Sequence, residues 1–183
     1  MTDTDVRIRP MRNDEFDGVR ALEVAAFGDD ESIGVLLDAL RASWAWVPEL
    51  SIVAELDAQV CAHVSFTRAI VDAPDRLVDV LVLSPVGVRP DLHRQGIGSA
   101  MITQALGLIA GTRPEPAVFL EGDPAYYRRL GFEAAGTYGF RRPSLRIPEP
   151  AFQVFRLPSF DATLSGTLVY PDAFWRTDSV GLR

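Results

Sequence analysis

The sequence predicts one α/β (α+β) domain in which a mixed, mostly antiparallel sheet carries helices on both faces. Three patterns indicate this fold class. Residues 76–88, 96–111 and 116–122 read as strand, helix and strand, and such a crossover joins parallel strands. Residues 50–56 and 59–71 read as strands around a two-residue turn, which is typical of an antiparallel hairpin. Two amphipathic helices precede that hairpin.

The N-terminal segment is expected to begin with a strand at 6–11 and to continue with two helices. Residues 13–27 start with Asn13 as a candidate N-cap and carry acidic residues early, as helix N-termini prefer. Residues 29–43 repeat apolar side chains at helical spacing, namely Ile33, Leu36, Leu37 and Leu40.

One face of the strand at 59–71 carries the polar residues Cys61, His63, Ser65 and Thr67. A row of this kind can serve nucleophilic catalysis, but a histidine base needs a group such as a carboxylate to orient it. No carboxylate on this strand could do so. We therefore interpret the row as a mixed polar strand face, and we do not expect Cys61 to form an acyl-enzyme.

The strand at 76–88 is almost continuously apolar, which indicates a central strand covered on both faces. Pro85 interrupts it, and a proline cannot donate to a strand ladder. Backbone groups after Pro85, at Val86, Gly87 and Val88, are therefore expected to lack a strand partner. Buried N–H groups must bond something, and a ligand is one candidate.

The C-terminal third changes character at residue 141. Residues 123–131 are expected to form a short helix closed by Gly131, followed by a strand at 132–140. A proline-rich stretch then leads into β-rich segments. We divide the chain into a core, residues 1–140, and a C-terminal β-rich extension, residues 141–183, that packs on the same domain.

Composition excludes several classes of protein. The 183 residues carry a net charge of −7 and no lysine, which argues against nucleic-acid binding, a Walker A loop and Schiff-base chemistry. No apolar run approaches the ~20 residues of a membrane span, and we expect neither a signal peptide nor membrane binding. Because Cys61 is the only cysteine, we expect a cytoplasmic protein, and we predict no metal site.

The stretch RQGIGS places two glycines at the start of the helix at 96–111. The free N–H groups and positive dipole end of a helix N-terminus bind phosphate. Gly96 and Gly98 lack β-carbons, so an anion can approach the backbone closely. A Rossmann fold is not favoured, because Met101 takes the third glycine position and the preceding strands are hairpin-joined. We therefore predict a cradle for a pyrophosphate.

Two longer stretches carry a resemblance to a known family. VGVRPDLHRQGIGSAMI followed by VFLEGDPAYYRRLGFEAAG resembles the GCN5-related N-acetyltransferase (GNAT) family, with its Q/R-x-x-G-x-G/A motif and a tyrosine four residues before a Gly-Phe pair. The likeness covers residues 6–140 well and the tail loosely. It is strongest to a bacterial subgroup of predicted acetyltransferases with a C-terminal β extension. It implies a GNAT-like sheet with a splayed parallel strand pair at the cofactor site.

The resemblance implies acetyl-CoA as cosubstrate and assigns residues to it. The backbone of Val86, Gly87 and Val88 would pair with the pantetheine arm, and the Val88 N–H would stabilise the thioester oxyanion. Tyr127 matches the tyrosine that protonates the leaving thiolate, whereas Tyr126 fits packing better. The pyrophosphate cradle would comprise Arg94, Gln95, Gly96, Ile97, Gly98 and Ser99.

One residue departs from the family pattern, and one catalytic role has no residue assigned to it by a motif. His93 stands where the family usually has Gln or Arg, so we expect this change to affect the affinity for the nucleotide. The base that deprotonates the amine is not identified by a motif. Glu121, at the end of the strand at 116–122, is our candidate, while His63 or a water chain could serve instead and Asp79 lies too early.

The function expected is an N-acetyltransferase that moves an acetyl group from acetyl-CoA to a primary amine by direct attack in a ternary complex. A non-catalytic acyl-CoA-binding or sensing domain and an acyltransferase for longer acyl-CoAs are the alternatives. The acceptor, a small molecule or a peptide amine, is left open. Its site should be built by residues 27–48 and the tail, 141–183. Pairing of two chains into a homodimer through the tail also stays open.

Overall fold

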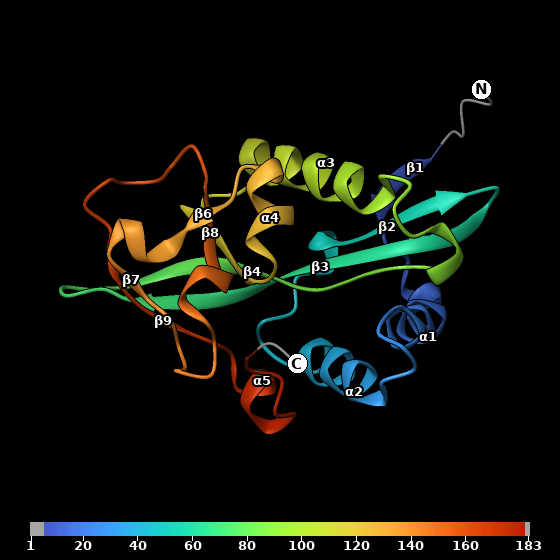
Figure 1. Ribbon diagram of the computed structural model, residues 1–183, viewed down its shortest axis with the longest axis horizontal. Helices are drawn as coiled ribbons and strands as arrows, with labels where there is room; N and C mark the ends of the chain where they lie inside the picture. The colour runs from blue at the N-terminus through green and yellow to red at the C-terminus, as the bar shows by residue number, and fades with distance from the viewer. Residues whose placement is uncertain (1–5, 182–183) are drawn as a thin grey trace.

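The computed structural model describes residues 6–181, and within them nine strands form one sheet (Figure 1). The strand order along the sheet is β1-β2-β3-β4-β5-β8-β6, while β9 pairs with β3 and with β7. The strands are β1 (Arg7–Pro10), β2 (Ser51–Leu56), β3 (Gln59–Asp72), β4 (Leu77–Val88), β5 (Ala117–Glu121), β6 (Glu133–Ala134), β7 (Phe140–Arg141), β8 (Phe152–Arg156) and β9 (Gly166–Val169). Most neighbouring pairs are antiparallel, and β4 runs parallel to β5, so the predicted fold class is confirmed.

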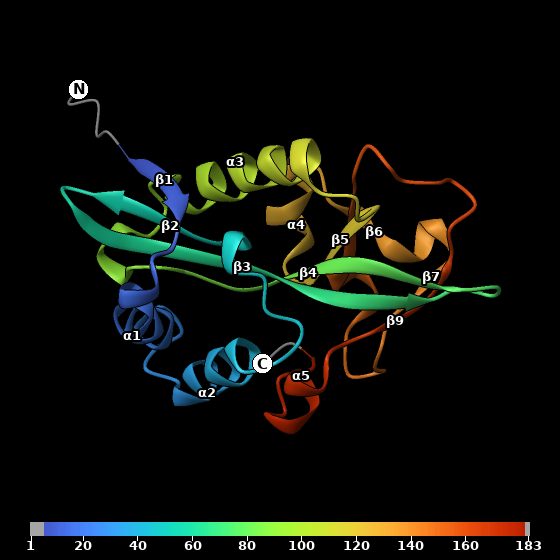
Figure 2. The ribbon, with the colours of Figure 1, turned by 180° about the vertical axis from the view of Figure 1, so that it is seen from behind.

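Helices cover both faces of the sheet, as the sequence predicts. They are α1 (Phe16–Ala26), α2 (Glu31–Arg41), α3 (Ile97–Thr112), α4 (Pro124–Tyr127) and α5 (Asp172–Arg176). α3 and α4 lie on one face, and α1, α2 and α5 lie on the other (Figures 1 and 2). Each face has its own apolar core, one around Met101 of α3 and one around Leu40 of α2. Within residues 6–181 none of these helices has both the length and the hydropathy to cross a bilayer.

The β2–β3 hairpin forms where the sequence predicts it. Leu56 pairs with Gln59, and the two residues between them, Asp57 and Ala58, have φ of 50° and 60°. Positive φ at both central positions is the geometry of the tight turn that matches strand twist. β3 then pairs along its length with β4, so β2, β3 and β4 form the antiparallel centre of the sheet.

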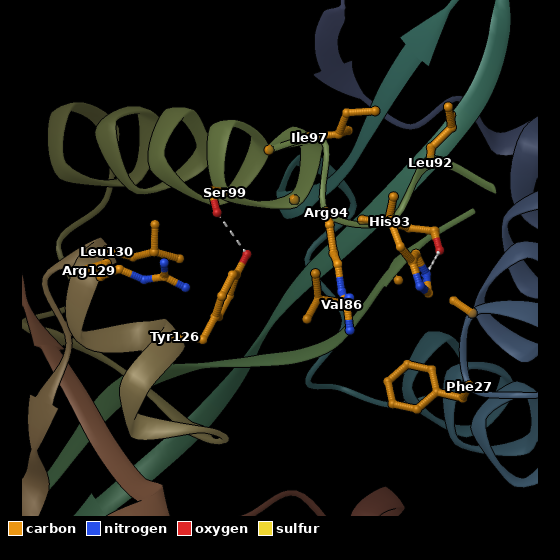
Figure 3. A pocket seen from close by; sticks show the side chains of 15 residues that line it. Phe27, Val86, Leu92, His93, Arg94, Ile97, Ser99, Tyr126, Arg129 and Leu130 are labelled. Atoms are coloured by element: carbon orange, nitrogen blue, oxygen red, sulfur yellow. Dashed lines mark hydrogen bonds between the residues drawn. The ribbon is translucent and has the colours of Figure 1, made fainter. Parts of the chain in front are cut away.

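β4 leaves its parallel neighbour before it ends. Its pairing with β5 stops at Val82 opposite Phe119, whereas on its other edge β3 still pairs it at Val86, Gly87 and Val88. The expected break at Pro85 is therefore one-sided, because β4 remains a strand against β3 while its opposite edge is opened. Val86 lies on this open stretch, beneath the first turn of α3 (Figure 3). The splayed strand pair thus stands next to a helix N-terminus.

Two local predictions are wrong. Residues 132–140 form only the short strands β6 and β7, joined by a 3-10 turn at Ala135–Tyr138, because Gly139 ends that turn with a φ of 78°. Asn13 does not cap a helix, since a 3-10 turn covers Asn13–Glu15 and α1 begins at Phe16. The expected end of the helix at 123–131 is confirmed, with Gly131 at a φ of 92°.

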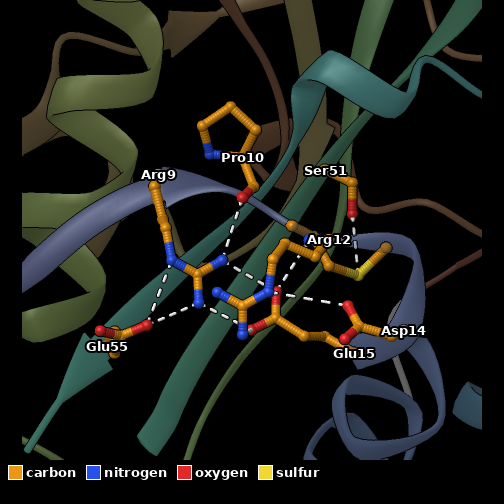
Figure 4. Close-up of polar contacts among 8 residues, drawn as sticks. Arg9, Pro10, Arg12, Asp14, Glu15, Ser51 and Glu55 are labelled. Carbon is orange, nitrogen blue, oxygen red and sulfur yellow. Dashed lines mark hydrogen bonds and ion pairs between the residues drawn. The ribbon is translucent and has the colours of Figure 1, made fainter. Parts of the chain in front are cut away.

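Glu15 ties this corner together through hydrogen bonds to residues that precede it. Its carboxylate accepts the Arg12 backbone N–H at 2.7 Å and two bonds from Arg9, at 2.6 and 2.8 Å (Figure 4). Arg9 also bonds Glu55 of β2, at 2.6 Å, which ties β1 to the hairpin. The Arg9 guanidinium lowers the pKa of Glu15 to about 2.

The tail, residues 141–183, contributes strands to the same sheet. β8 lies antiparallel to β5, with Glu121 opposite Phe152, and β9 pairs with the end of β3. α5 packs against α2 (Figures 1 and 2). A domain boundary at residue 140 stays a prediction, but the tail's position brings residues 170–181 beside β5.

Candidate active site

The start of α3 is built for close approach by a ligand. Gly96 caps the helix with a φ of 83°, a conformation that side chains with a β-carbon adopt at a cost. A Cβ on Gly96 would meet no atom within 4 Å, so the space before the helix is open. The first N–H groups of a helix lack partners within it, and here they face that space. The geometry is that of an anion-binding helix N-terminus.

A cavity of about 850 Å³ lies between this helix start and the open edge of β4 (Figure 3). It contains eight of the residues predicted to bind the cosubstrate, namely Val86, Gly87, Val88, Arg94, Gly96, Ile97, Gly98 and Ser99. Gln95 does not line it, because its side chain turns back to donate to the Asp91 carbonyl at 3.3 Å. The sequence thus places most of this site, which we name the first cavity.

The first cavity concentrates positive charge in an acidic protein. Arg94 and Arg129 line it, and the residues that line it within the described chain include no carboxylate. Arg129 lies 5.7 Å from the Tyr126 ring and was not predicted, because it follows the tyrosine motif rather than the glycine motif. Arg89, by contrast, bonds Asp91 at 2.7 Å and does not line the cavity. Charge and free N–H groups therefore favour an anionic ligand.

Backbone alternation shows which groups of β4 face the cavity. The Arg89 N–H donates to the Cys61 carbonyl of β3 at 2.8 Å. Successive N–H groups of a strand point to opposite edges, so the Val88 N–H points to the edge that β5 has left. His93 Nε2 lies 2.7 Å from the Val88 carbonyl, and donation from that nitrogen holds the chain end of β4 beside the loop that leads to α3. This contact gives a structural role to His93, the residue that departs from the family motif.

The two adjacent tyrosines of α4 separate into different cavities. Tyr126 lines the first cavity, and its hydroxyl accepts a hydrogen bond from Ser99 at 3.1 Å (Figure 3). Tyr127 is 9% exposed and lines a second cavity. Burial raises the pKa of Tyr127, which keeps its phenol protonated. Sequence reasoning assigned Tyr126 to packing, yet its hydroxyl lies at the start of α3, beside the position where a Cβ on Gly98 would be.

The second cavity, of about 320 Å³, meets the first at Phe27 and Val86. It is bounded by the start of α2, the open stretch of β4, the end of β5 and the tail. Its lining comprises Phe27, Asp30, Ser32, Ile33, Leu36, Val82, Leu83, Ser84, Pro85, Val86, Glu121, Tyr127, Tyr170, Phe174, Ser179 and Gly181. The lining from the tail carries no motif, so sequence reasoning could name the segment but not its residues.

Glu121 is held in place at the wall of the second cavity. One carboxylate oxygen accepts from the Tyr170 hydroxyl at 2.8 Å, and the other accepts from the Gly181 backbone N–H at 2.9 Å. Burial raises the pKa of Glu121, while these two hydrogen bonds oppose the rise. The candidate base and the candidate acid Tyr127 therefore line one cavity.

A buried polar cluster lies under the open stretch of β4. His63 Nδ1 is 2.6 Å from Glu23 Oε1 of α1, and His63 Nε2 is 3.0 Å from the Ser51 hydroxyl. All three side chains are fully buried, and burial raises the pKa of Glu23. No carboxylate of β3 itself orients His63, as expected, but α1, forty residues earlier, supplies one.

We assign this cluster a structural role, since none of its three residues lines either cavity. The second Glu23 oxygen, Oε2, lies against Gly87, where a Cβ would come within 2.6 Å of it. Glycine is therefore needed at position 87 by packing.

Two other candidates from the sequence also lie away from the cavities. Cys61 is buried, which raises the pKa of its thiol. Asp79 is exposed opposite Ile70, well before the open stretch of β4. Among residues 6–181 no group of three metal-ligating side chains is found.

In this fold a helix N-terminus faces a strand that has left its neighbour, and the two cavities meet at that strand. The sequence profile described as the acetyltransferase (GNAT) domain matches residues 7–135. The chain therefore belongs to the GNAT acetyltransferase family, as its motifs predict.

Two solved structures show how far the likeness extends. The GNAT family N-acetyltransferase YhbS from Escherichia coli, in complex with CoA, is 27% identical, with 96% of this chain and 95% of that chain covered and a TM-score of 0.84. A GNAT family acetyltransferase from Brucella melitensis, in complex with acetyl-CoA, is 29% identical, with 93% and 99% covered and a TM-score of 0.74. A comparison with curated proteins found no match. Both likenesses include the tail, which the family profile does not reach.

Proposed function

We propose that this protein is an acetyl-CoA-dependent N-acetyltransferase that transfers the acetyl group to a primary amine by direct attack in a ternary complex. The observation that carries the proposal is the junction of two chemically different cavities at Val86. The first is cationic and lined by glycines, and the second holds Tyr127 and Glu121. Solved relatives bound to CoA and acetyl-CoA support the choice of donor.

The residues of the first cavity fit acetyl-CoA. The N–H groups at Gly96 to Ser99, with Arg94 and Arg129, would hold the pyrophosphate, and a Cβ on Gly98 would fill space beside Val88 that the ligand needs. The open edge of β4 offers backbone groups of Val86 and Val88 to the pantetheine arm. Bound acetyl-CoA supplies an activated thioester carbonyl.

Three groups of the chain would act on the reacting atoms. The Val88 N–H faces the opened edge and would stabilise negative charge on the thioester oxygen. Tyr127 would donate its proton to the departing thiolate, since its phenol is protonated at neutral pH. Glu121 would take the proton that the amine loses, and its raised pKa makes it a stronger base than an exposed carboxylate. Both side chains line the second cavity, where the amine would enter.

We place the reaction in a reducing compartment such as the cytoplasm, since the single cysteine, Cys61, is buried and the sequence offers it no partner. A small-molecule or peptide amine is the proposed partner. No nucleic acid partner is proposed for a chain of net charge −7.

The test is release of free CoA from acetyl-CoA in the presence of a panel of primary amines. We expect amine-dependent release that falls strongly in Tyr127→Phe. Acetyl-CoA binding without turnover on every amine, unchanged by Tyr127→Phe, would instead support a sensing domain. Faster turnover with a longer acyl-CoA than with acetyl-CoA would identify a different donor and overturn that part of the proposal.

A further inference from the structure

The residues that line the second cavity favour one kind of amine over others. We propose that it admits a small primary amine with one ammonium group and a compact apolar body, of about the size of a phenylalkylamine, and without a carboxylate. This inference rests on the proposed function, because it takes the second cavity as the acceptor site.

The two cavities differ in the charge of the residues that line them. The described residues that line the second cavity include two carboxylates, Glu121 and Asp30, and no arginine or histidine. Asp30 also caps α2, where its side chain accepts the Ser32 N–H at 2.9 Å. The first cavity has the opposite composition, with Arg94 and Arg129 and no carboxylate. An ammonium ion is therefore favoured in the second cavity, while an added carboxylate on the acceptor would be repelled.

Glu121 is suited to bind and orient the ammonium group. Its two oxygens are each held by one donor, from Tyr170 and Gly181, so the carboxylate cannot turn away. A carboxylate has about four acceptor positions, which leaves capacity for a further donor on these oxygens. The raised pKa of Glu121 makes this carboxylate a better acceptor for the ammonium proton, and loss of that proton frees the amine for attack.

Apolar side chains also line the second cavity. They come from α2, α4 and α5 and from the residues that directly follow α1 and β9, namely Phe27, Ile33, Leu36, Tyr127, Tyr170 and Phe174. Tyr170 and Phe174 stack with their ring centroids 4.8 Å apart, which presents a firm wall. An apolar body is stabilised by leaving water for such a surface, and aromatic faces also attract a cation. A polyamine offers the charge but not the apolar body.

The second cavity is the smaller of the two. It measures about 320 Å³, which suits a small molecule. Four residues of the tail line it, namely Tyr170, Phe174, Ser179 and Gly181. α5 of the tail lies next to α2 (Figures 1 and 2). A folded protein would have to extend a single side chain into this space, whereas we expect 2-phenylethylamine to enter it whole.

The test compares four acceptors with acetyl-CoA: 2-phenylethylamine, phenylalanine, spermidine and a short lysine peptide. We expect kcat/KM for 2-phenylethylamine to exceed that of each of the others at least tenfold. Higher turnover with spermidine or with the peptide would overturn the inference while leaving the proposed transfer to an amine intact. If 2-phenylethylamine binds in the presence of CoA but no acceptor is acetylated, the proposed function fails and the assignment of the cavity stands.

A pair of variants locates the ammonium group. In calorimetry with CoA present, Glu121→Gln is expected to weaken 2-phenylethylamine binding at least tenfold, because a neutral amide replaces the carboxylate. CoA affinity should not change, since Glu121 does not line the first cavity. The matched control is Glu49→Gln, at an exposed residue that lines neither cavity. Equal amine affinity in Glu121→Gln and Glu49→Gln would overturn the assignment.

Discussion

Gly98→Val is the substitution that most directly probes the start of α3. A Cβ on Gly98 would lie 3.3 Å from Val88 Cγ2 and 3.4 Å from the Tyr126 hydroxyl, which is already close contact. The two methyl groups of valine extend further and therefore occupy part of the first cavity beside the helix N–H groups. A phosphate oxygen must come within about 2.9 Å of such an N–H to bond it. Valine at this position is expected to keep the phosphate away.

The magnitude follows from the bonds that are lost. A hydrogen bond to a charged group contributes about 1.5–3 kcal/mol, so loss of one such bond weakens CoA binding about 10- to 150-fold. The fold should stay intact, because Gly98 lies in regular helix and the higher helix propensity of valine offsets part of the cost of these close contacts.

The assay is calorimetric titration with CoA, together with thermal unfolding of each variant. Gly107→Val is the matched control, since it makes the same change on the same helix, where a Cβ meets no atom within 4 Å. The control is expected to bind CoA like the unmodified protein. The reasoning is refuted if Gly98→Val binds CoA with unchanged affinity, or if Gly107→Val loses as much affinity as Gly98→Val.

Three further predictions concern ionisable groups. Tyr127→Phe should lower kcat by about 10²–10⁴-fold with little change in CoA affinity, measured by amine-dependent CoA release; a normal kcat would remove Tyr127 from the mechanism. Burial raises the pKa of Glu121, so the ionised side chain lowers fold stability once pH rises through the pKa that it has in the folded state. Glu121→Gln should therefore raise Tm at pH 7 without ligands, by about 2–4 °C for each kcal/mol gained. A lower Tm would show that its hydrogen bonds outweigh its burial. Arg9 lowers the pKa of Glu15 from 4.5 to about 2, so this pair stabilises the fold above pH 4.5 and the contribution is lost as pH falls toward 2 (Figure 4). Glu15→Gln should lower Tm at pH 7 and flatten the dependence of Tm on pH in that window, and an unchanged slope would contradict the assignment.

The first cavity is the part of the site that the sequence predicts best. Most of the residues that line it lie in one continuous stretch, Val86 to Ser99, in which a strand, a loop and a helix start follow one another. Local rules suffice there, because glycine conformation, helix N–H groups and a proline in a strand act over a few residues. Gln95 is the exception, since its exposed side chain bonds Asp91 in its own loop.

The remaining features depend on contacts between distant segments. Glu23 meets His63 from forty positions away, and Tyr170 meets Glu121 from forty-nine, so neither pair has a local signal. Tyr126 and Tyr127 are adjacent in sequence, and only the packing of α4 decides which cavity each one lines. The strand predicted at 132–140 fails for a local reason instead, because Gly139 permits a turn that the alternating pattern conceals.

The central claim is that the two cavities together transfer an acetyl group to an amine. The most direct measurement is mass spectrometry of a reaction containing the purified protein, acetyl-CoA and 2-phenylethylamine, with free CoA quantified in parallel. The account predicts one N-acetylated amine for each CoA released, with both products reduced together in Tyr127→Phe. Release of CoA without an acetylated amine, or no product from any amine although acetyl-CoA binds, would contradict it.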